Sequence, residues 1–393
     1  MTITKHTFSN LWRRVAWRVQ GDDYNRTDGR CRLAPEWLVL VINNFCNLRC
    51  KMCDVGIGES ASVFYAHLIG DDPRNMPLSL LETILEQAAR FFPKPKIGLA
   101  YTEPLIHVKI LDFCRTTVSR GFYCTLTTNG FMLPRLADDL VEIGVHEITV
   151  SIDGPEAIHD RIRGRKGSFR KLYEGVEQLN RAKAKTGRAR PIVRFSYTLT
   201  DENYTHMLDF VRQVEGLQPA SLVFSHLNFI SEEMATVHNA HYDGEWAMTY
   251  SNLGTMNLET IDLEAMGQAL RDLKAYARAR PRFPSLTIVP DVSMGADLEI
   301  YYQQPLRFIG GRKCTDPWRM MMIRTEGTVI PAHGRCYNVP IGNVTEMPLK
   351  ELWDTARFRA FRKTLQEAGG TLPACARCCG VIGKPKEETE HFV

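Results

Sequence analysis

The cysteines are the residues of this sequence whose type and spacing point most directly to chemistry. The chain of 393 residues contains 11 of them, and two groups are closely spaced, one between positions 46 and 53 and one between 375 and 379. The N-terminus has no secretory signal, so we expect a cytoplasmic protein whose thiols stay reduced. Closely spaced thiols in a reducing compartment favour metal binding or redox chemistry over disulfide bonds.

The first group has the pattern Cys46-x3-Cys50-x2-Cys53. Thiolates are the usual ligands of iron–sulfur clusters, and this spacing lets one loop supply several of them. Three thiolates on a four-iron cluster leave one iron open to a small molecule. Zinc is the main alternative, but it normally takes two Cys-x2-Cys pairs or a cysteine and histidine set, and the nearest histidine is His67. Ordinary buried cysteines are the other alternative, and the spacing favours metal binding.

Short runs of branched apolar residues alternate with helical periodicities from Trp37 onward. This alternation predicts parallel strands joined by helical crossovers, and the continuous apolar runs predict strands covered on both faces. Six such units fit a doubly wound sheet or an incomplete (β/α) barrel, and in both folds ligands bind at the C-terminal ends of the strands. The predicted strands are 37–43, 97–101, 122–128, 146–152, 192–199 and 221–227, and the predicted helices are 78–92, 106–120, 134–143, 168–185 and 204–215.

Segments with chemically useful side chains follow the ends of these predicted strands. Residues 43–53 follow the first strand and 102–104 follow the second, while 128–130 end the third and 151–154 end the fourth. The C-terminal ends of parallel strands lie at one edge of the sheet, so we expect the chemistry of this protein there.

Several motifs, in this order, resemble those of radical S-adenosylmethionine enzymes. CNLRCKMC at 46–53 matches the cysteine loop of that family, and YTEP at 101–104 resembles its second motif, usually Gly-Gly-Glu-Pro. TTNG at 127–130 and VSIDGPEAIHDRIRGRKGSF at 150–169 resemble the segments that end its third and fourth strands. The resemblance covers residues 35–228 and implies an α/β fold, namely an incomplete (β/α)6 TIM-like barrel.

The resemblance also implies cofactors and the residues that hold them. Cys46, Cys50 and Cys53 would ligate a catalytic 4Fe-4S cluster whose open iron chelates S-adenosylmethionine. One electron would then release a 5′-deoxyadenosyl radical, which abstracts a hydrogen atom from the substrate. The residues implied to contact S-adenosylmethionine are Thr102, Glu103, Asn129, Ser151 and Arg163. Two of these residues have an alternative role that does not involve the cofactor. Glu103 would cap the helix that follows it, and Arg163 would be a solvated surface charge.

Two departures from the family pattern concern the cofactor site. Tyr101 and Thr102 replace both glycines of the second motif, so we expect the backbone to approach the methionine moiety differently there. Met52 occupies a position that is usually aromatic, and a polarizable methionine can still pack beside an adenine ring.

The C-terminal region resembles the SPASM/twitch extension that many of these enzymes carry. A full SPASM domain binds two clusters and needs more than the five cysteines present here, so the resemblance implies one twitch-like auxiliary 4Fe-4S cluster. Its ligands would be Cys314, Cys336, Cys375 and Cys378. The resemblance lies in Cys314, Trp318, the hairpin turn at Gly327, IGNV at 341–344, LKELWDTARFRAFR at 349–362 and the terminal CARC.

The auxiliary site departs from the family at one ligand. Ala332 stands where the family has a cysteine, and Cys336, four residues later, is the available substitute. Cys379 is adjacent to Cys378 in the sequence, so either thiol is an available fourth ligand. Zinc bound to the same four thiols is the alternative to a cluster.

The chain divides into four predicted segments. An N-terminal helical segment spans 1–34, with a helix at 8–20 that packs on the body or, alternatively, lies on a membrane surface. The barrel spans 35–228 and the auxiliary domain 313–393. Between them, 229–312 is interpreted as an insertion near the substrate, with a helix at 259–279 and a strand at 286–290; further elements are a hairpin turning at 326–327 and a helix at 348–367.

The resemblance implies a radical reaction on an organic substrate that the sequence does not identify. We expect oxidation or epimerisation of a small molecule or sugar-like alcohol, which includes lipid-linked sugars. Modification of a ribosomal peptide is an alternative, although only 45 residues precede Cys46, which is short for an upstream peptide-recognition domain. An alternative role for Cys124 is that of hydrogen-atom donor in an epimerisation. No other residue is assigned a catalytic role.

The remaining expectations concern partners. A radical enzyme needs an electron donor such as flavodoxin or ferredoxin. The net charge of +4 is too small to indicate nucleic-acid binding, and no apolar run has the length of a transmembrane segment. A non-enzymatic interaction module stabilised by metal is the second alternative, but such a module has no need of cofactor contacts at Ser151 and Arg163.

Overall fold

A computed structural model of the chain describes residues 23–69, 72–292, 296–309, 313–332, 336 and 339–382. The helix expected at 8–20 lies outside the described residues. The described part is an α/β structure built on one sheet of 10 strands. Among the described residues, no helix combines the length and the apolar character needed to cross a membrane.

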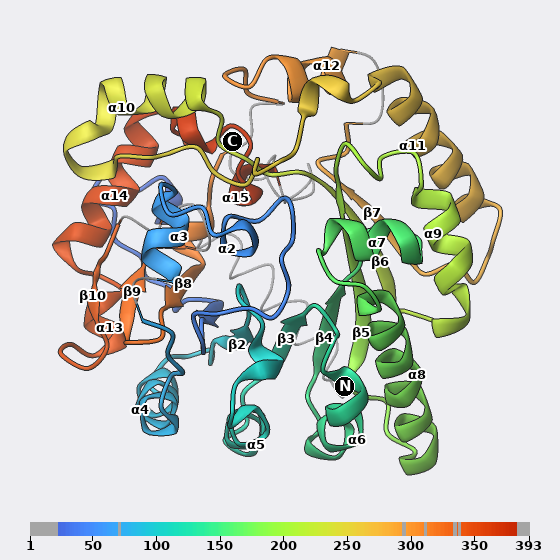
Figure 1. Cartoon of the computed structure of the whole chain (residues 1–393). Coiled ribbons are helices and arrows are strands. Elements are labelled where there is room, and N and C mark those ends of the chain that lie inside the picture. The colour runs from blue at the N-terminus through green and yellow to red at the C-terminus, as the bar shows by residue number, and fades with distance from the viewer. Residues whose placement is uncertain are drawn as a thin grey trace, which may run out of the picture.

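Six central parallel strands confirm the predicted strand–helix alternation, and each pairs with the next along the chain. Figure 1 shows α4, α5, α6 and α8 on the outer side of these strands. The strands are β1 (Trp37–Leu40), β2 (Lys96–Leu99), β3 (Cys124–Thr128), β4 (Glu147–Ser151), β5 (Ile192–Leu199) and β6 (Ser221–His226). The helices are α4 (Leu78–Ala88), α5 (Ile110–Ser119), α6 (Leu133–Ile143), α7 (Glu156–Ile162), α8 (Ser168–Thr186) and α9 (Met207–Val214).

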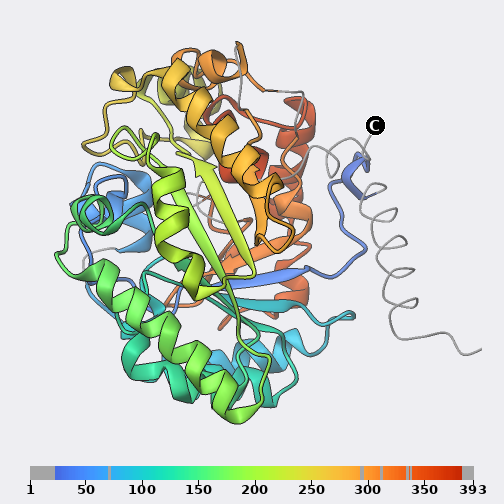
Figure 2. The same ribbon diagram turned by 90° about the vertical axis from the view of Figure 1, so that its right-hand side faces the viewer.

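Two further parallel strands extend this sheet beyond the six predicted units. β7 (Ser285–Val289) pairs with β6, and β8 (Met320–Ile323) pairs with the free edge of β1. In Figure 2, C-terminal segments (orange to red) lie beside the blue strand β1. The sheet therefore includes strands from the predicted insertion and from the C-terminal region. Pairing of this kind satisfies the backbone groups that an edge strand would otherwise leave open.

The hairpin predicted at 326–327 is present and ends the sheet. β8 pairs antiparallel with β9 (Thr328–Ile330), which pairs with β10 (Gly342–Asn343). Gly327 has a φ of 92°, and a Cβ atom there would lie 2.7 Å from Asn343 Oδ1. Both the turn conformation and the close contact therefore require glycine.

The two faces of the central strands differ in burial. In β4, Ile148 and Val150 are buried while Thr149 and Ser151 are half-buried, and in β5 Tyr197 packs against Phe210 of α9. The expectation of strands covered on both faces is therefore wrong for β4, because successive side chains point to opposite faces and only the helix-side face is fully covered.

The insertion and the C-terminal region add short elements around the C-terminal ends of the strands. The predicted helix at 348–367 is two helices, because the Thr355 hydroxyl accepts a hydrogen bond from the Phe358 N–H and starts a new helix. These elements are α10 (Glu232–Trp246), α11 (Leu263–Arg278), α12 (Ala296–Gln303), α13 (Leu349–Leu352), α14 (Ala356–Glu367), η6 (Pro373–Cys375) and α15 (Cys379–Ile382).

Candidate functional site

The loop that carries the first three cysteines runs from β1 to the short helix α2 (Asp54–Ile57). Its backbone pairs with the end of α7. The N–H of Arg49 donates to the carbonyl of Arg163 at 3.2 Å, and the N–H of Lys51 donates to the carbonyl of Ile162 at 3.0 Å. This pairing joins the first and the fourth sequence motifs at the C-terminal edge of the sheet.

Two glycines permit the close approach of this loop. A Cβ atom on Gly164 would lie 2.4 Å from the carbonyl oxygen of Arg49, and one on Gly56 would lie 2.5 Å from the carbonyl oxygen of Cys50. Contacts this short do not occur, so any side chain at either position would displace the cysteine loop.

Nitrogen donors from two other motifs lie next to the thiols. Arg163 Nη1 is 3.7 Å from Cys50 Sγ, and Asn129 Nδ2 is 3.9 Å from Cys46 Sγ. Burial raises the pKa of the Cys46 thiol to about 11 and that of Cys53 to about 12. These thiols therefore keep their protons at neutral pH until a cation binds, and a metal that binds them would release those protons.

Arg163 is held in place from its other side. Its Nη2 lies 2.5 Å from Asp153 Oδ2, and the Asp153 carboxylate also accepts the Thr198 N–H at 2.8 Å. Arg163 is only 9% exposed, so its interpretation as a solvated surface charge is wrong. Within the described residues its Nε is buried without a hydrogen-bond partner. Buried donors are almost always hydrogen-bonded, so this Nε is available to a bound acceptor.

Glu103 links the second motif to the third. Its buried carboxylate accepts hydrogen bonds from the Leu105 N–H at 3.0 Å, the Thr128 hydroxyl at 2.6 Å and the Asn129 N–H at 2.7 Å. The bond to Leu105 is the capping role considered above, and the other two hold the end of β3. Burial nevertheless raises the pKa of Glu103 to about 7.

Thr102 and Tyr101 occupy the positions where the family has glycines. The Thr102 hydroxyl lies 2.5 Å from the carbonyl oxygen of Asn43 and 2.8 Å from its Oδ1, so it ties the second motif to the start of the cysteine loop. Tyr101 has a φ of 88°, a conformation that favours glycine. Tyr101 therefore keeps a glycine-like backbone conformation, and the different backbone approach to the methionine moiety stays a prediction.

Ser151, the remaining predicted cofactor residue, is half-buried at the end of β4, with Ser196 of β5 as its neighbour in the sheet. Cys124 does not fit the role of hydrogen donor. It is fully buried, and its thiol is hydrogen-bonded to the buried thiol of Cys114 in the helix α5. Both are therefore core cysteines.

Asp54 is a residue that the sequence analysis missed. It directly follows Cys53, is fully buried, and accepts hydrogen bonds from the hydroxyls of Ser62 and Ser251, both at 2.6 Å. It also accepts the Asn252 N–H at 2.7 Å. A buried carboxylate next to a cysteine motif was the available signal, but two of its three partners, Ser251 and Asn252, lie in the insertion and have no recognisable motif.

The second group of cysteines comes together around Cys336. Burial raises the pKa of its thiol well above the ordinary value, and the neighbouring thiols of Cys314, Cys378 and Cys375 add to that shift. The described residues contain no set of three or more cysteine, histidine, aspartate or glutamate side chains placed to hold one metal ion.

Arg377, between Cys375 and Cys378, joins the auxiliary site to the barrel. Its fully buried guanidinium donates from Nε to the carbonyl of Tyr301 at 2.7 Å and from Nη2 to that of Gln304 at 3.0 Å, at the end of α12. The Tyr301 hydroxyl in turn donates to the carbonyl of Leu227, after β6, at 2.7 Å. Arg377 thus connects the terminal cysteine pair to the C-terminal end of β6.

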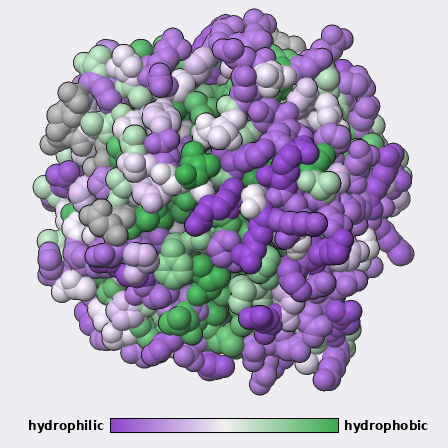
Figure 3. Space-filling model, viewed as in Figure 1, coloured by the Kyte–Doolittle hydropathy of each residue, from purple (hydrophilic) through white to green (hydrophobic). Residues whose placement is uncertain are grey.

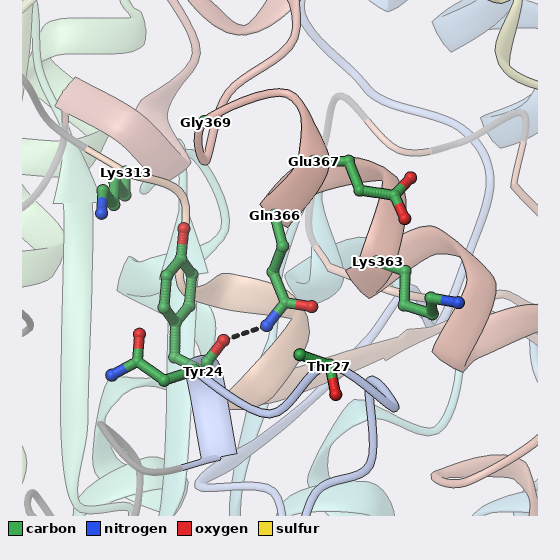
Figure 4. A pocket seen from close by; sticks show the side chains of 8 residues that line it. Tyr24, Thr27, Lys313, Lys363, Gln366, Glu367 and Gly369 are labelled. Atoms are coloured by element: carbon green, nitrogen blue, oxygen red, sulfur yellow. Dashed lines mark hydrogen bonds between the residues drawn. The ribbon is translucent and has the colours of Figure 1, made fainter.

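A surface pocket of about 350 Å³ lies on another side of the auxiliary region, between Tyr24 and α14. Figure 4 shows the Gln366 amide directed at the Tyr24 carbonyl, which it meets in a hydrogen bond, with Lys313, Lys363 and Glu367 around them. Burial and the nearby Cys314 raise the pKa of the Tyr24 hydroxyl to about 12. The pocket carries charges of both signs and none of the seven predicted cysteine ligands.

A curved, mostly parallel sheet with a three-cysteine loop at the C-terminal edge and a second cysteine site after it defines a class of iron–sulfur enzymes. Sequence comparison agrees: the Radical SAM superfamily matches residues 40–214, and the SPASM iron–sulfur cluster-binding domain matches residues 314–379. This chain belongs to the Radical SAM superfamily. The Radical SAM domain implies a 4Fe-4S cluster with S-adenosylmethionine, and the SPASM domain implies auxiliary iron–sulfur binding.

Two relatives are similar over most of their length. The AdoMet-dependent heme synthase of Methanosarcina barkeri is 30% identical, with 87% of this chain and 88% of that protein covered. The tungsten-containing aldehyde ferredoxin oxidoreductase cofactor-modifying protein of Pyrococcus furiosus is 24% identical, with 87% of each covered.

Solved structures share the fold at low sequence identity. SuiB of Streptococcus suis, bound to its precursor peptide SuiA, has a TM-score of 0.59 at 14% identity and covers 92% of this chain and 73% of that one. Native anSMEcpe with bound AdoMet has a TM-score of 0.56 at 16% identity and covers 90% and 95%. The predicted fold class is confirmed, and these likenesses show the fold alone.

Proposed function

We propose that this enzyme holds its catalytic 4Fe-4S cluster with Cys46, Cys50 and Cys53 and uses it to oxidise a small organic molecule. The observation that carries the proposal is the contact of Arg163 and Asn129, from two different motifs, with the thiols of that loop. When bound, the cluster and S-adenosylmethionine supply a 5′-deoxyadenosyl radical that removes a hydrogen atom from the substrate.

The surrounding side chains fit S-adenosylmethionine by charge. Arg163 has a buried, unpartnered Nε for the carboxylate of the methionine moiety, and Asp153 holds its guanidinium in position. Glu103, whose pKa burial raises to about 7, becomes fully charged when the cationic amino group binds beside it. Thr102, Asn129 and Ser151 line the same edge and complete the proposed cofactor contacts.

The auxiliary site is proposed to hold one 4Fe-4S cluster on Cys314, Cys336, Cys375 and Cys378. The grouping of the other three thiols around Cys336 supports its use in place of the family ligand missing at Ala332. Cys378 is among the thiols near Cys336, and we propose it as the fourth ligand. A fully ligated cluster has no open iron, so it suits electron acceptance or structural support.

The names of the two relatives that match over most of their length support a proposal for the substrate class. One is named for making heme and the other for modifying a cofactor, so we infer a small molecule of the cofactor type rather than a ribosomal peptide. The peptide alternative is favoured by the SuiB structure, whose likeness to this chain is one of fold. Oxidation is preferred over epimerisation because net oxidation requires the substrate radical to lose one more electron, which a cluster at the auxiliary site would accept.

The test is cofactor cleavage by anaerobically reconstituted protein reduced with dithionite. We expect 5′-deoxyadenosine and methionine in equal amounts, and none from a variant in which Cys46, Cys50 and Cys53 are alanine. The matched control replaces Cys31, Cys114 and Cys124, three cysteines outside both sites, and should retain activity. Equal product from the first variant would show that the catalytic cluster lies elsewhere.

A further inference from the structure

The cysteine loop reaches the protein surface between Cys46 and Cys50. Arg49 is exposed there, and its Nη1 donates to the carbonyls of Cys46 and Leu48 at 3.4 and 3.3 Å. The exposed Arg165 donates from Nη1 to the carbonyl of Asn47 at 3.0 Å. Two solvent-facing guanidinium groups therefore lie directly on the backbone of the loop that carries the proposed cluster ligands.

These side chains form a strip of uncompensated positive charge. Arg49, Arg165 and Lys166 are exposed, and none of them forms an ion pair within the described part of the chain. The neighbouring cations Lys51 and Arg161 share one carboxylate, that of Glu202. The Asp160 carboxylate on the same segment is occupied by hydrogen bonds from residues 167–169.

A groove of about 510 Å³, lined by apolar and charged side chains, adjoins this strip between the N-terminal ends of α5 and α6. Val108 on its edge is 80% exposed. The groove also contains Lys109, which is exposed, and an ion pair between Asp112 and Arg115. Figure 3 shows a hydrophobic area directly beside strongly hydrophilic side chains on this face. The apolar residues that line the groove are Leu105, Ile106, Val108, Leu111, Met132 and Leu136.

Phe131 joins the strip to the groove and to the cysteine loop. The Arg165 guanidinium lies 3.8 Å from the centre of the Phe131 ring, and Met132 of the groove is the next residue. The Phe131 N–H donates to Asn129 Oδ1 at 3.0 Å, and Asn129 contacts the Cys46 thiol. A partner on this surface would thus be separated from Cys46 by a single layer of side chains.

We propose that this surface, formed by the basic strip and the adjoining groove, docks an acidic one-electron carrier protein. The proposal rests on the proposed function, because cleavage of one carbon–sulfur bond of S-adenosylmethionine to methionine and a 5′-deoxyadenosyl radical consumes one electron. The reduced carrier would supply that electron and be oxidised, and a cluster held by Cys46, Cys50 and Cys53 would receive it. A partly apolar groove beside an uncompensated basic strip is complementary to a carrier whose redox group is ringed by carboxylates.

The test compares two double variants with the same change of charge. Lys109→Glu/Lys166→Glu reverses two charges on the proposed surface. Lys350→Glu/Lys363→Glu reverses two exposed charges on α13 and α14, away from it. Neither pair belongs to the proposed cluster or cofactor contacts. The rate of 5′-deoxyadenosine formation is measured with dithionite and, separately, with a photoreduced bacterial flavodoxin and a reduced ferredoxin, at low and high salt.

With dithionite, both variants should match wild type. With a protein donor, the Lys109/Lys166 variant should need roughly tenfold more carrier for half-maximal rate, and high salt should slow the wild type toward the variant. Equal loss in both variants, or loss in neither, would overturn the docking surface. A wild type that dithionite activates but that neither carrier reduces would overturn it as well. Failure of the wild type with dithionite would instead refute the proposed function.

Discussion

The hydroxyl of Ser251 lies 2.6 Å from the carboxylate of Asp54, a residue 197 positions earlier in the chain. Asp54 follows Cys53 directly, and Ser251 belongs to the insertion after β6. A Cβ atom on nearby Gly254 would lie 2.1 Å from the carbonyl oxygen of Lys51, so the insertion also touches the cysteine loop itself. The proposed catalytic loop is therefore held by a segment from outside the six central strands.

Asp54→Ala should destabilise the metal-free protein and impair cluster loading. It removes the acceptor of three hydrogen bonds, two of them buried, at a cost of about 2–4 kcal/mol in the free energy of unfolding. Asp54→Asn keeps one oxygen and should recover about half of that loss. Anaerobic urea unfolding and iron analysis measure both effects. Asp272→Ala, which removes an exposed carboxylate, is the control, and a similar loss in it would argue against a special role for Asp54.

Glu103 should give the protein a distinctive pH dependence. Its carboxyl ionises near 4.5 in an unfolded chain but at a pKa of about 7 in the folded one, because burial disfavours the charge. The folded state therefore holds the proton more tightly, and this contribution to stability is present below pH 4.5 and is lost as pH rises to about 7. In Glu103→Gln the loss over that interval should disappear, as measured by urea midpoints of metal-free protein. An unchanged pH profile would contradict the assignment.

The ion pair between Arg163 and Asp153 determines how Arg163 must be tested. Arg163→Ala leaves a buried carboxylate unpaired and should cost about 3–5 kcal/mol in unfolding free energy, so its binding defect would be ambiguous. Arg163→Lys keeps the charge but loses the second arm of the guanidinium. We expect it to fold, to retain its iron, and to bind S-adenosylmethionine roughly tenfold more weakly by calorimetry. If Arg163→Lys binds S-adenosylmethionine with wild-type affinity, the proposed contact of Arg163 with the cofactor is wrong.

The auxiliary site can be tested by iron content. Reconstituted wild type should carry about eight irons per chain, and Cys336→Ala and Cys378→Ala should each lower this toward about four. Cys379→Ala, a change of the adjacent thiol, should leave the iron unchanged. Cleavage of S-adenosylmethionine should survive in all three. Zinc in place of iron at this site would refute the auxiliary cluster and leave the catalytic one intact.

Most of the proposed site was predictable because its motifs are local. The spacing of Cys46, Cys50 and Cys53 is set within one loop, and Glu103, Asn129 and Ser151 each stand at the end of a strand with a recognisable apolar pattern. Parallel pairing then places them at one edge of the sheet. Asp153 was visible within the fourth motif, but its pairing with Arg163 was not, because an ion pair depends on how α7 folds back over the strand.

The sequence alone determined the alternation of strands and helices, the cysteine loop after β1 and the hairpin at Gly327, because each depends on residues close together in the chain. Only the tertiary structure decided that β7 and β8 join the central sheet, that Ser251 and Gly254 hold the cysteine loop, and that Arg377 connects the terminal cysteines to α12. These contacts form between backbone and side-chain groups far apart in the chain. A strand edge or a buried carboxylate can pair with any segment that supplies hydrogen-bond donors in the right places. The sequence around the strand or the carboxylate therefore does not identify the segment that pairs with it.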